Sequence, residues 1–502
     1  MKPVLTLLTN SRTTDSLRPG RRGESLAIWR RACAACALLW KTRTTDSLRP
    51  GRRGESLAIW RRACAACAFL WKTRTTDSLR PGRRGESLAL WRRAYAAFAL
   101  LFLAATLTAA DPAQELLAQA RKSPNSAEFK TALGKILRQG RGATGYNGEF
   151  LFAAEAKAAP VLELDEAPGP KFARLKGSDL WMARATLKTG TSHRYAITID
   201  GQTNPPIDFP AFGPDSYENP AAPAGQLSDK IVHTSKVYAG MVTNYWVYVP
   251  AQYNAATAAA LFVVQDGQGY ANREGANRLL ITLDNLTHQK RIPVAITVMI
   301  SPGMIGERRM RSIQYDTVDD TYARFLREEI IKDVEAKYNI RKDAYSRAIM
   351  GESSGAICAF TVAWFDTERY SRVFSRIGTY TSIQWKPGQK DGGNIYPFWL
   401  RKSPRKNIRV WLQDSSNDLE NDHGSWPLQN IQMANSLKMK EYDFKFTWGN
   451  GGHSTAQGNA QAAEALTWLW RGYDPAKTSE TFVMDPAEKA KPYWRVKALN
   501  RE

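Results

Sequence analysis

The chain is organised around one pentapeptide, Gly351-Glu352-Ser353-Ser354-Gly355. It follows a stretch of strand composition, 345–350, and precedes an apolar, helix-like stretch, 356–364. A serine on a sharp strand-to-helix turn needs glycine on both sides, because a Cβ there would clash with the strand and the helix. We therefore expect a nucleophile elbow, with Ser353 as the nucleophile. The Ser354 N–H, at a helix N-terminus, is the expected donor to an oxyanion.

Segments of strand and helix composition alternate around this elbow, from residue 231 to 475. We expect strands at 233–238, 243–249, 260–265, 293–300, 346–350, 373–377, 408–413 and 443–448. We expect helices at 271–283, 318–338, 355–364, 429–438 and 460–470. Such alternation predicts an α/β domain, a mostly parallel sheet flanked by helices as in the α/β-hydrolase fold, with reactive groups at the carboxyl ends of the strands.

The region before this domain has a different pattern. A helical segment, 111–144, is followed by short strand-like segments separated by turns rich in Gly, Pro and Asp, which predict a small all-β, immunoglobulin-like sandwich. Its expected strands are 150–153, 161–164, 180–185 and 195–199. We interpret the proline-rich residues 202–230 as a linker over the surface, so that sandwich and linker occupy 145–230. Residues 476–502 are interpreted as a C-terminal tail.

The positive charge of the chain is concentrated at its N-terminus. Residues 1–110 hold 21 Lys and Arg against six Asp and Glu, which supplies +15 of the net charge of +22. The remaining residues are only mildly basic, a balance that gives no support for a nucleic-acid partner.

Residues 1–110 are interpreted as a leader of three 31-residue units. The first two copies, 12–42 and 43–73, are almost identical, as expected of a recent duplication. The third runs from basic residues into the apolar stretch 94–105 and ends in small residues before Asp111. This order predicts a secretory signal peptide cleaved near Ala110, and hence a protein exported to the periplasm or the medium. The apolar stretch is too short for a stable membrane span.

A serine nucleophile needs a histidine base and a carboxylate that orients it. In the chain order serine, acid, histidine, only His423 and His453 remain, and His453 is favoured because it lies in a Gly-rich loop after the last expected strand. The acid follows the strand 408–413. We favour Asp418 over Asp414, because an acid so near a strand end commonly caps the loop. A second oxyanion donor is expected from the Gly267 or Gln268 N–H.

These motifs together resemble the putative esterase family that includes enterochelin esterases, feruloyl esterases and mycolyltransferases. The resemblance covers 145–475, beginning with a sandwich of early-set, carbohydrate-binding-module-like type. It is carried by the following stretches: 195–201, 311–316, 351–355, 413–419, 424–427 and 449–454. Ser416-Asn417-Asp418 is similar to the family's Gly-x-Asn-Asp turn, which implies that Asp418 is the acid. The resemblance assigns nucleophile and base to Ser353 and His453, with an acyl-enzyme hydrolysed by water.

Three classes of function are compatible with these residues. The leading one is a secreted serine carboxylic ester hydrolase, for which Arg311, Tyr315 and Trp426 are candidate substrate-binding residues. Its ester substrate could be polysaccharide-linked, as a feruloyl or acetyl ester, or a siderophore. An acyltransferase and a catalytically silent carbohydrate-binding protein on the same scaffold are the alternatives. No cofactor is expected, and no His-x-x-x-His or clustered ligand set suggests a metal. The sequence does not determine the oligomeric state.

Overall fold

The structure is a computed structural model that describes residues 111–140, 142–388 and 392–495. The chain divides into two units, Met1–Leu107 and Thr108–Glu502, and the described residues all belong to the second. The predicted repeats and signal peptide lie outside the described residues.

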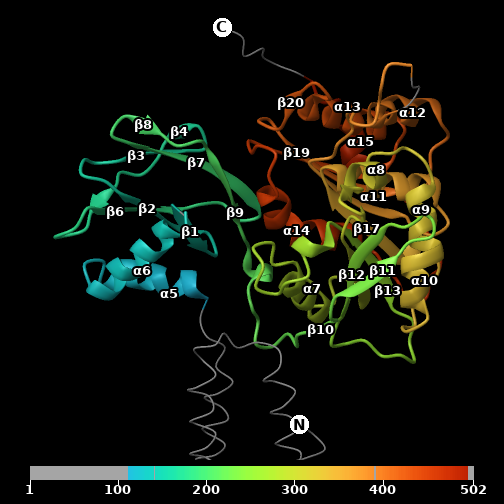
Figure 1. The fold of residues 1–502 in the computed structure, drawn as a ribbon, viewed down its shortest axis with the longest axis horizontal. Helices are drawn as coiled ribbons and strands as arrows, with labels where there is room; N and C mark the ends of the chain where they lie inside the picture. The colour runs from blue at the N-terminus through green and yellow to red at the C-terminus, as the bar shows by residue number, and fades with distance from the viewer. Residues whose placement is uncertain (1–110, 141, 389–391, 496–502) are drawn as a thin grey trace, which may run out of the picture. The chain divides into compact units, whose positions relative to one another are not determined.

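The C-terminal part of this unit is built on an 11-stranded sheet (Figure 1). Its main order is β16-β15-β12-β14-β13-β17-β18-β19-β22, and β10 and β11 pair with β12. Neighbouring strands from β14 to β22 run parallel, whereas β12 is antiparallel to β14. The strands are β10 (Gln226–Leu227), β11 (Ile231–Thr234), β12 (Val242–Val249), β13 (Ala260–Gln265), β14 (Ala295–Ile300), β15 (Met304–Ile305), β16 (Arg308–Arg309), β17 (Arg347–Glu352), β18 (Arg372–Arg376), β19 (Arg409–Ser415) and β22 (Asp443–Gly449).

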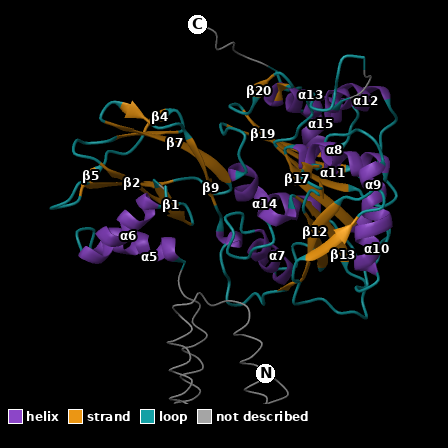
Figure 2. Cartoon of the chain, viewed as in Figure 1, coloured by secondary structure: helices purple, strands orange, loops and turns teal. Residues whose placement is uncertain are grey.

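Helices cover both faces of this sheet (Figure 2). Alternate residues of β13 point to opposite faces, so that Leu261 and Val263 join one apolar cluster and Phe262 and Val264 join the other. The first cluster also takes side chains from α9 (Thr321–Phe325), α10 (Ile331–Glu335), α11 (Ser354–Phe365), α12 (Tyr396–Lys402) and α13 (Trp426–Met439). The second takes side chains from α7 (Leu279–His288) and α14 (Ala456–Leu469). The predicted α/β class is confirmed.

Two of the expected helices differ from the structure. The helix expected at 271–283 begins only at Leu279, because Asp266 and Arg278 have left-handed backbones, φ 53° and 55°, and a 3-10 turn, η3 (Gly267–Gly269), follows β13. The helix expected at 318–338 begins at Thr321 and is interrupted by a π-helical turn, η4 (Leu326–Ile330).

The N-terminal part of the unit is a two-sheet sandwich with two helices. One sheet has the order β1-β2-β6-β5, and the other has β4-β3-β7-β8 with β9 also paired to β7. The strands are β1 (Ala143–Tyr146), β2 (Glu149–Glu155), β3 (Val161–Leu164), β4 (Ala167–Pro168), β5 (Ala173–Arg174), β6 (Leu180–Thr186), β7 (Thr191–Ile199), β8 (Gln202–Thr203) and β9 (Ile207–Ala211). Phe150 and Phe152 of β2 face the other sheet. Leu151 and Ala153 face the helices α5 (Pro112–Lys122) and α6 (Ala127–Arg138).

The interpretation of 202–230 as a surface linker is wrong for its first part. Strand β9 pairs antiparallel with β7, and Ala211 is fully buried in the sandwich core beside the partly buried Phe209. Proline suggested a linker here, but Pro210 lies in a strand at the edge of its sheet, a position that tolerates a missing N–H.

Candidate active site

Ser353 lies on a sharp turn between β17 and α11. Its backbone has φ 56° and ψ −125°, a strained conformation for a residue with a side chain. The glycine before it is required for packing, since a Cβ on Gly351 would lie 2.0 Å from the carbonyl oxygen of Gly355. A Cβ on Gly355 would lie 3.1 Å from an Asp266 carboxylate oxygen. The turn therefore has the geometry of a nucleophile elbow, where a side chain is presented above the sheet edge.

The structure brings Ser353, His453 and Asp418 into one line of hydrogen bonds. Ser353 Oγ lies 2.8 Å from His453 Nε2, and His453 Nδ1 lies 2.5 Å from Asp418 Oδ1. His453 follows β22 and Asp418 follows β19, so the carboxyl ends of parallel strands bring together residues far apart in sequence. The Asp418 side chain is fully buried, whereas 21% of the His453 side chain is exposed. Solvent or a substrate can thus reach the imidazole but not the carboxylate.

The alternative acid, Asp414, is a neighbour of Asp418. It is the penultimate residue of β19, is fully buried, and accepts a 2.8 Å hydrogen bond from the Ser415 N–H. Burial raises its pKa well above the ordinary value, and its hydrogen bond and repulsion with Asp418 act in the same direction. The carboxylate in contact with His453 is that of Asp418. The other histidine considered, His423, lies in a turn with 41% of its side chain exposed.

The expected oxyanion donors lie on two segments that approach each other. Ser354 is the first residue of α11, and N–H groups in the first turn of a helix have no partner within it. Gly267 and Gln268 belong to η3, after β13. A Cβ on Gly267 would lie 2.3 Å from the Ile300 nitrogen, so only glycine allows this turn to pack against the end of β14.

Two of the predicted substrate-binding residues, Arg311 and Tyr315, contact Asp266, the residue that precedes η3. The Arg311 guanidinium makes two hydrogen bonds, of 2.8 and 2.9 Å, to the carboxylate of Asp266. Its Nη2 also lies 3.4 Å from the Glu352 carbonyl oxygen in the elbow. Tyr315 is fully buried, and its hydroxyl accepts a 3.2 Å hydrogen bond from the Asp266 N–H. Both side chains hold Asp266 in place, and Tyr315 has no surface to offer a substrate.

The third such residue, Trp426, packs against the histidine. Its ring lies edge-on to that of His453, with centroids 5.8 Å apart, and it is 2% exposed. The indole N–H donates a 3.2 Å hydrogen bond to Thr379 Oγ1, which in turn lies 3.3 Å from Ser353 Oγ. Sequence analysis missed Thr379, and no motif in its surroundings could have indicated it.

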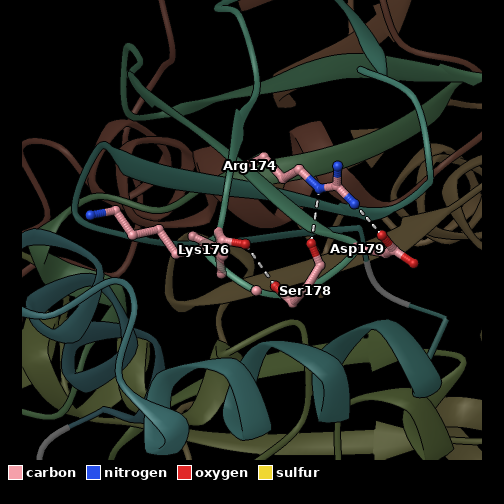
Figure 3. A pocket seen from close by; sticks show the side chains of 6 residues that line it. Arg174, Lys176, Ser178 and Asp179 are labelled. Atoms are coloured by element: carbon pink, nitrogen blue, oxygen red, sulfur yellow. Dashed lines mark hydrogen bonds and ion pairs between the residues drawn. The ribbon is translucent and has the colours of Figure 1, made fainter.

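One surface hollow lies elsewhere, in the hairpin between β5 and β6 (Figure 3). It has a volume of about 560 Å³. Its polar groups bond one another: Arg174 Nε donates to the Ser178 carbonyl at 2.9 Å, and its guanidinium also pairs with Asp179. It contains no nucleophile beside a base and is not part of the candidate site.

The part of the chain that the structure describes holds neither a metal-ligand cluster nor a long apolar helix. Within it, no group of three or more His, Cys, Asp or Glu side chains is arranged to hold a metal ion. Across the same residues, no helix combines the length and the apolar character needed to cross a membrane.

The sheet order and the serine elbow define the class of the protein as an α/β-hydrolase. A family model described as putative esterase matches residues 239–469. This part, just under half of the chain, is therefore similar to the putative esterase family, and the match supports a carboxylic ester hydrolase. No curated protein sequence matches the chain.

Several solved structures are similar to the chain. Enterobactin esterase from Shigella flexneri is 15% identical, over 68% of this chain and 100% of that chain, with a TM-score of 0.46. Ferric enterobactin esterase from Salmonella typhimurium is 16% identical, over 66% and 96%, with a TM-score of 0.45. The feruloyl esterase module of Clostridium thermocellum, complexed with sinapinate, is 15% identical, over 51% and 91%, with a TM-score of 0.39.

Proposed function

We propose that this protein is a serine esterase that works through an acyl-enzyme intermediate. Ser353 Oγ attacks the ester carbonyl while its proton passes to His453 Nε2. The Ser354 N–H and the N–H of Gly267 or Gln268 stabilise the negative oxygen of the tetrahedral intermediate. The bond to the alcohol breaks as His453 returns the proton to the leaving oxygen. Water then gives a proton to His453 and attacks the acyl carbon. The bond from that carbon to Ser353 Oγ breaks as His453 passes the proton to Oγ, which releases the acid.

One observation carries this proposal: the hydrogen bonds of 2.8 Å from Ser353 to His453 and 2.5 Å from His453 to Asp418. A hydroxyl is a poor nucleophile unless a base removes its proton, and a base within 3 Å can do so. The buried Asp418 carboxylate would fix the tautomer of His453 and stabilise the imidazolium that forms during attack.

The proposal includes a location and a substrate class. We propose export after cleavage near Ala110, supported by the basic, apolar and small-residue order of 91–110. We propose an ester on a polysaccharide as the substrate, which export and the sandwich domain favour. The buried Trp426 gives no support to a sugar-binding role of that residue. N-terminal sequencing of the secreted protein tests the location, and a start at residue 1 would contradict it.

The chemical proposal is tested on the full chain with p-nitrophenyl esters of short acids and with a fluorophosphonate label mapped by mass spectrometry. The wild type should release p-nitrophenol and carry the label on Ser353, and Ser353→Ala should do neither. A folded wild type that is inactive and unlabelled would refute the serine mechanism. Product analysis with an added alcohol separates hydrolysis from acyl transfer, and acetylated and feruloylated polysaccharides then test the substrate class.

A further inference from the structure

We infer that the β-sandwich completes the active site, with Asp208 of β9 as a positioning residue for His453. This inference rests on the proposed function of His453. It changes the role of the sandwich from an attached module to a part that the catalytic geometry requires.

Asp208 holds the chain on both sides of His453. Its Oδ2 accepts a 2.7 Å hydrogen bond from the Gly452 N–H and a 2.8 Å hydrogen bond from the Ser454 hydroxyl. The loop approaches this carboxylate closely, since a Cβ on Gly451 would lie only 3.4 Å from Asp208 Oδ2. Both neighbours of His453 are therefore bonded to one oxygen atom of the sandwich.

Asp208 is itself shielded from solvent and paired with a cation. Its side chain is 7% exposed, and Arg194 Nη1 lies 3.5 Å from its Oδ1. Arg194 and Asp208 are register partners in the pairing of β7 with β9, so the ion pair is built into a sheet. Strands β7 and β9 also pack against α14, which begins directly after the loop. The arginine balances the charge of the buried carboxylate, and the sheet fixes its direction.

A second contact joins the sandwich to the loop that carries Asp418. The Asn417 side-chain amide donates to Glu166 Oε1 at 3.1 Å and to the Asn450 carbonyl at 2.8 Å. The Asn450 amide donates to Asp165 Oδ1 at 3.2 Å. Asp165 and Glu166 form the turn between β3 and β4, so this turn connects the acid loop with the histidine loop.

The histidine loop needs such support because of its composition. Residues 449–452 read Gly-Asn-Gly-Gly, and glycine gives the backbone more conformations than any other residue. Catalysis needs His453 Nε2 within hydrogen-bond distance of Ser353 Oγ, and a displacement of 1 Å can cost about 100-fold in rate. Hydrogen bonds to a charged carboxylate are among the stronger ones available for fixing the loop.

The test compares Asp208→Ala with Glu163→Ala in the full chain. Glu163 is an exposed carboxylate of β3 in the same sandwich and serves as the matched control. We expect Asp208→Ala to lower kcat on p-nitrophenyl acetate by about 100-fold with KM little changed, when both proteins are assayed well below their unfolding midpoints. The midpoint itself should fall, because Arg194 is left without its carboxylate. Asp208→Asn, which keeps an oxygen that can accept both bonds, should restore most of the rate. Glu163→Ala should match the wild type.

Hydrogen exchange gives a readout that does not depend on activity. Amides in peptides covering 450–454 should exchange faster in Asp208→Ala than in the wild type, and at the wild-type rate in Glu163→Ala. Wild-type kcat and wild-type exchange in Asp208→Ala would overturn the inference, as would a loss of rate explained entirely by a lower unfolding midpoint. If Asp208→Ala does not fold, Ser454→Ala is the substitute, since it removes one of the two hydrogen bonds to Asp208. It should lower kcat by less than about 100-fold, and an unchanged kcat in Ser454→Ala would count against the inference. Failure of the serine mechanism is seen separately, as wild-type activity that Ser353→Ala does not change.

Discussion

The guanidinium of Arg376 lies 3.4 Å from the carboxylate of Glu352, the residue that precedes Ser353 in the elbow. Arg376 ends β18, and its side chain is 1% exposed. It also donates hydrogen bonds of 2.9 Å to the Tyr270 hydroxyl and 2.7 Å to Asn459 Oδ1. One buried cation thus joins the elbow, the segment after η3 and the helix that follows the histidine loop.

Replacing Arg376 by Met should destabilise the protein strongly. Breaking a buried ion pair leaves an uncompensated charge, which typically costs about 3–5 kcal/mol. We expect a loss of this size in the free energy of unfolding, measured with denaturant. The double variant Arg376→Met/Glu352→Gln removes the orphaned charge and should recover part of it. Equal losses in the single and double variants would contradict the pairing.

The two neighbouring acids should respond differently to the same substitution. Asp418→Asn should lower kcat/KM by about 10⁴-fold, because the amide favours the wrong tautomer of His453. Asp414→Asn should stay within about tenfold of the wild type, because the carboxylate that contacts His453 is that of Asp418 and an amide at 414 can still donate toward it. The measurement is ester hydrolysis near neutral pH. A larger loss in Asp414→Asn than in Asp418→Asn would make Asp414 the acid of the triad.

Asp316 should make stability depend on pH. Burial raises its pKa to about 6, although hydrogen bonds from Ser312 and Ser354 and the charge of Arg311 oppose the shift. Since the folded state binds this proton more tightly than the unfolded state, stability falls as pH rises from the unfolded pKa near 3.8 through about 6. Two pKa units correspond to roughly 3 kcal/mol.

The variant Asp316→Asn has no carboxyl group at this position and therefore no proton to lose in this pH range. Between pH 4 and pH 8 the wild type should therefore lose roughly 3 kcal/mol more free energy of unfolding than the variant. Comparing the change with pH, and not the absolute stability, cancels any pH-independent effect of the amide. Parallel pH profiles of the two proteins would show that Asp316 does not titrate in this range.

Gly351→Ala should be far more harmful than an alanine elsewhere. Its Cβ would lie 2.0 Å from backbone of the same elbow, so β17 or α11 must shift. We expect a loss of at least about 2 kcal/mol of stability, together with most of the esterase activity. Gly213→Ala is the matched control, because nothing lies within 4 Å of that position and its φ is −85°. Equal unfolding midpoints for the two variants would contradict the packing argument.

Patterns of composition were sufficient to predict the main strands of the sheet and several helices, but not the turns that connect them. The strand expected at 260–265 coincides with β13, and the expected helices at 355–364 and 429–438 lie within α11 and α13. Periodicity and the elbow glycines carry that information locally. The turn at 266–278 was missed, because its left-handed residues Asp266 and Arg278 depend on contacts with Arg311, Tyr315 and other distant side chains.

The candidate site likewise contains residues that could be predicted from the sequence and residues that could not. Ser353, His453 and Asp418 could be selected because strand ends and Gly-rich loops are visible in sequence. The supporting side chains could not, since Thr379, Asp208 and Arg376 reach the site only through tertiary contacts. Arg311 and Tyr315 were expected near the site and lie there, but their contacts are with Asp266.

The attachment of Gly452 and Ser454 to Asp208 links the site to the order in which the polypeptide is made. Domains generally fold as units, the N-terminal one first during synthesis. Strand β9, which receives the histidine loop, is thus made long before that loop. A nascent chain that ends before residue 453 holds Asp208 and Ser353 but no base, so under the proposed mechanism hydrolysis waits for one of the last parts of the chain to be made.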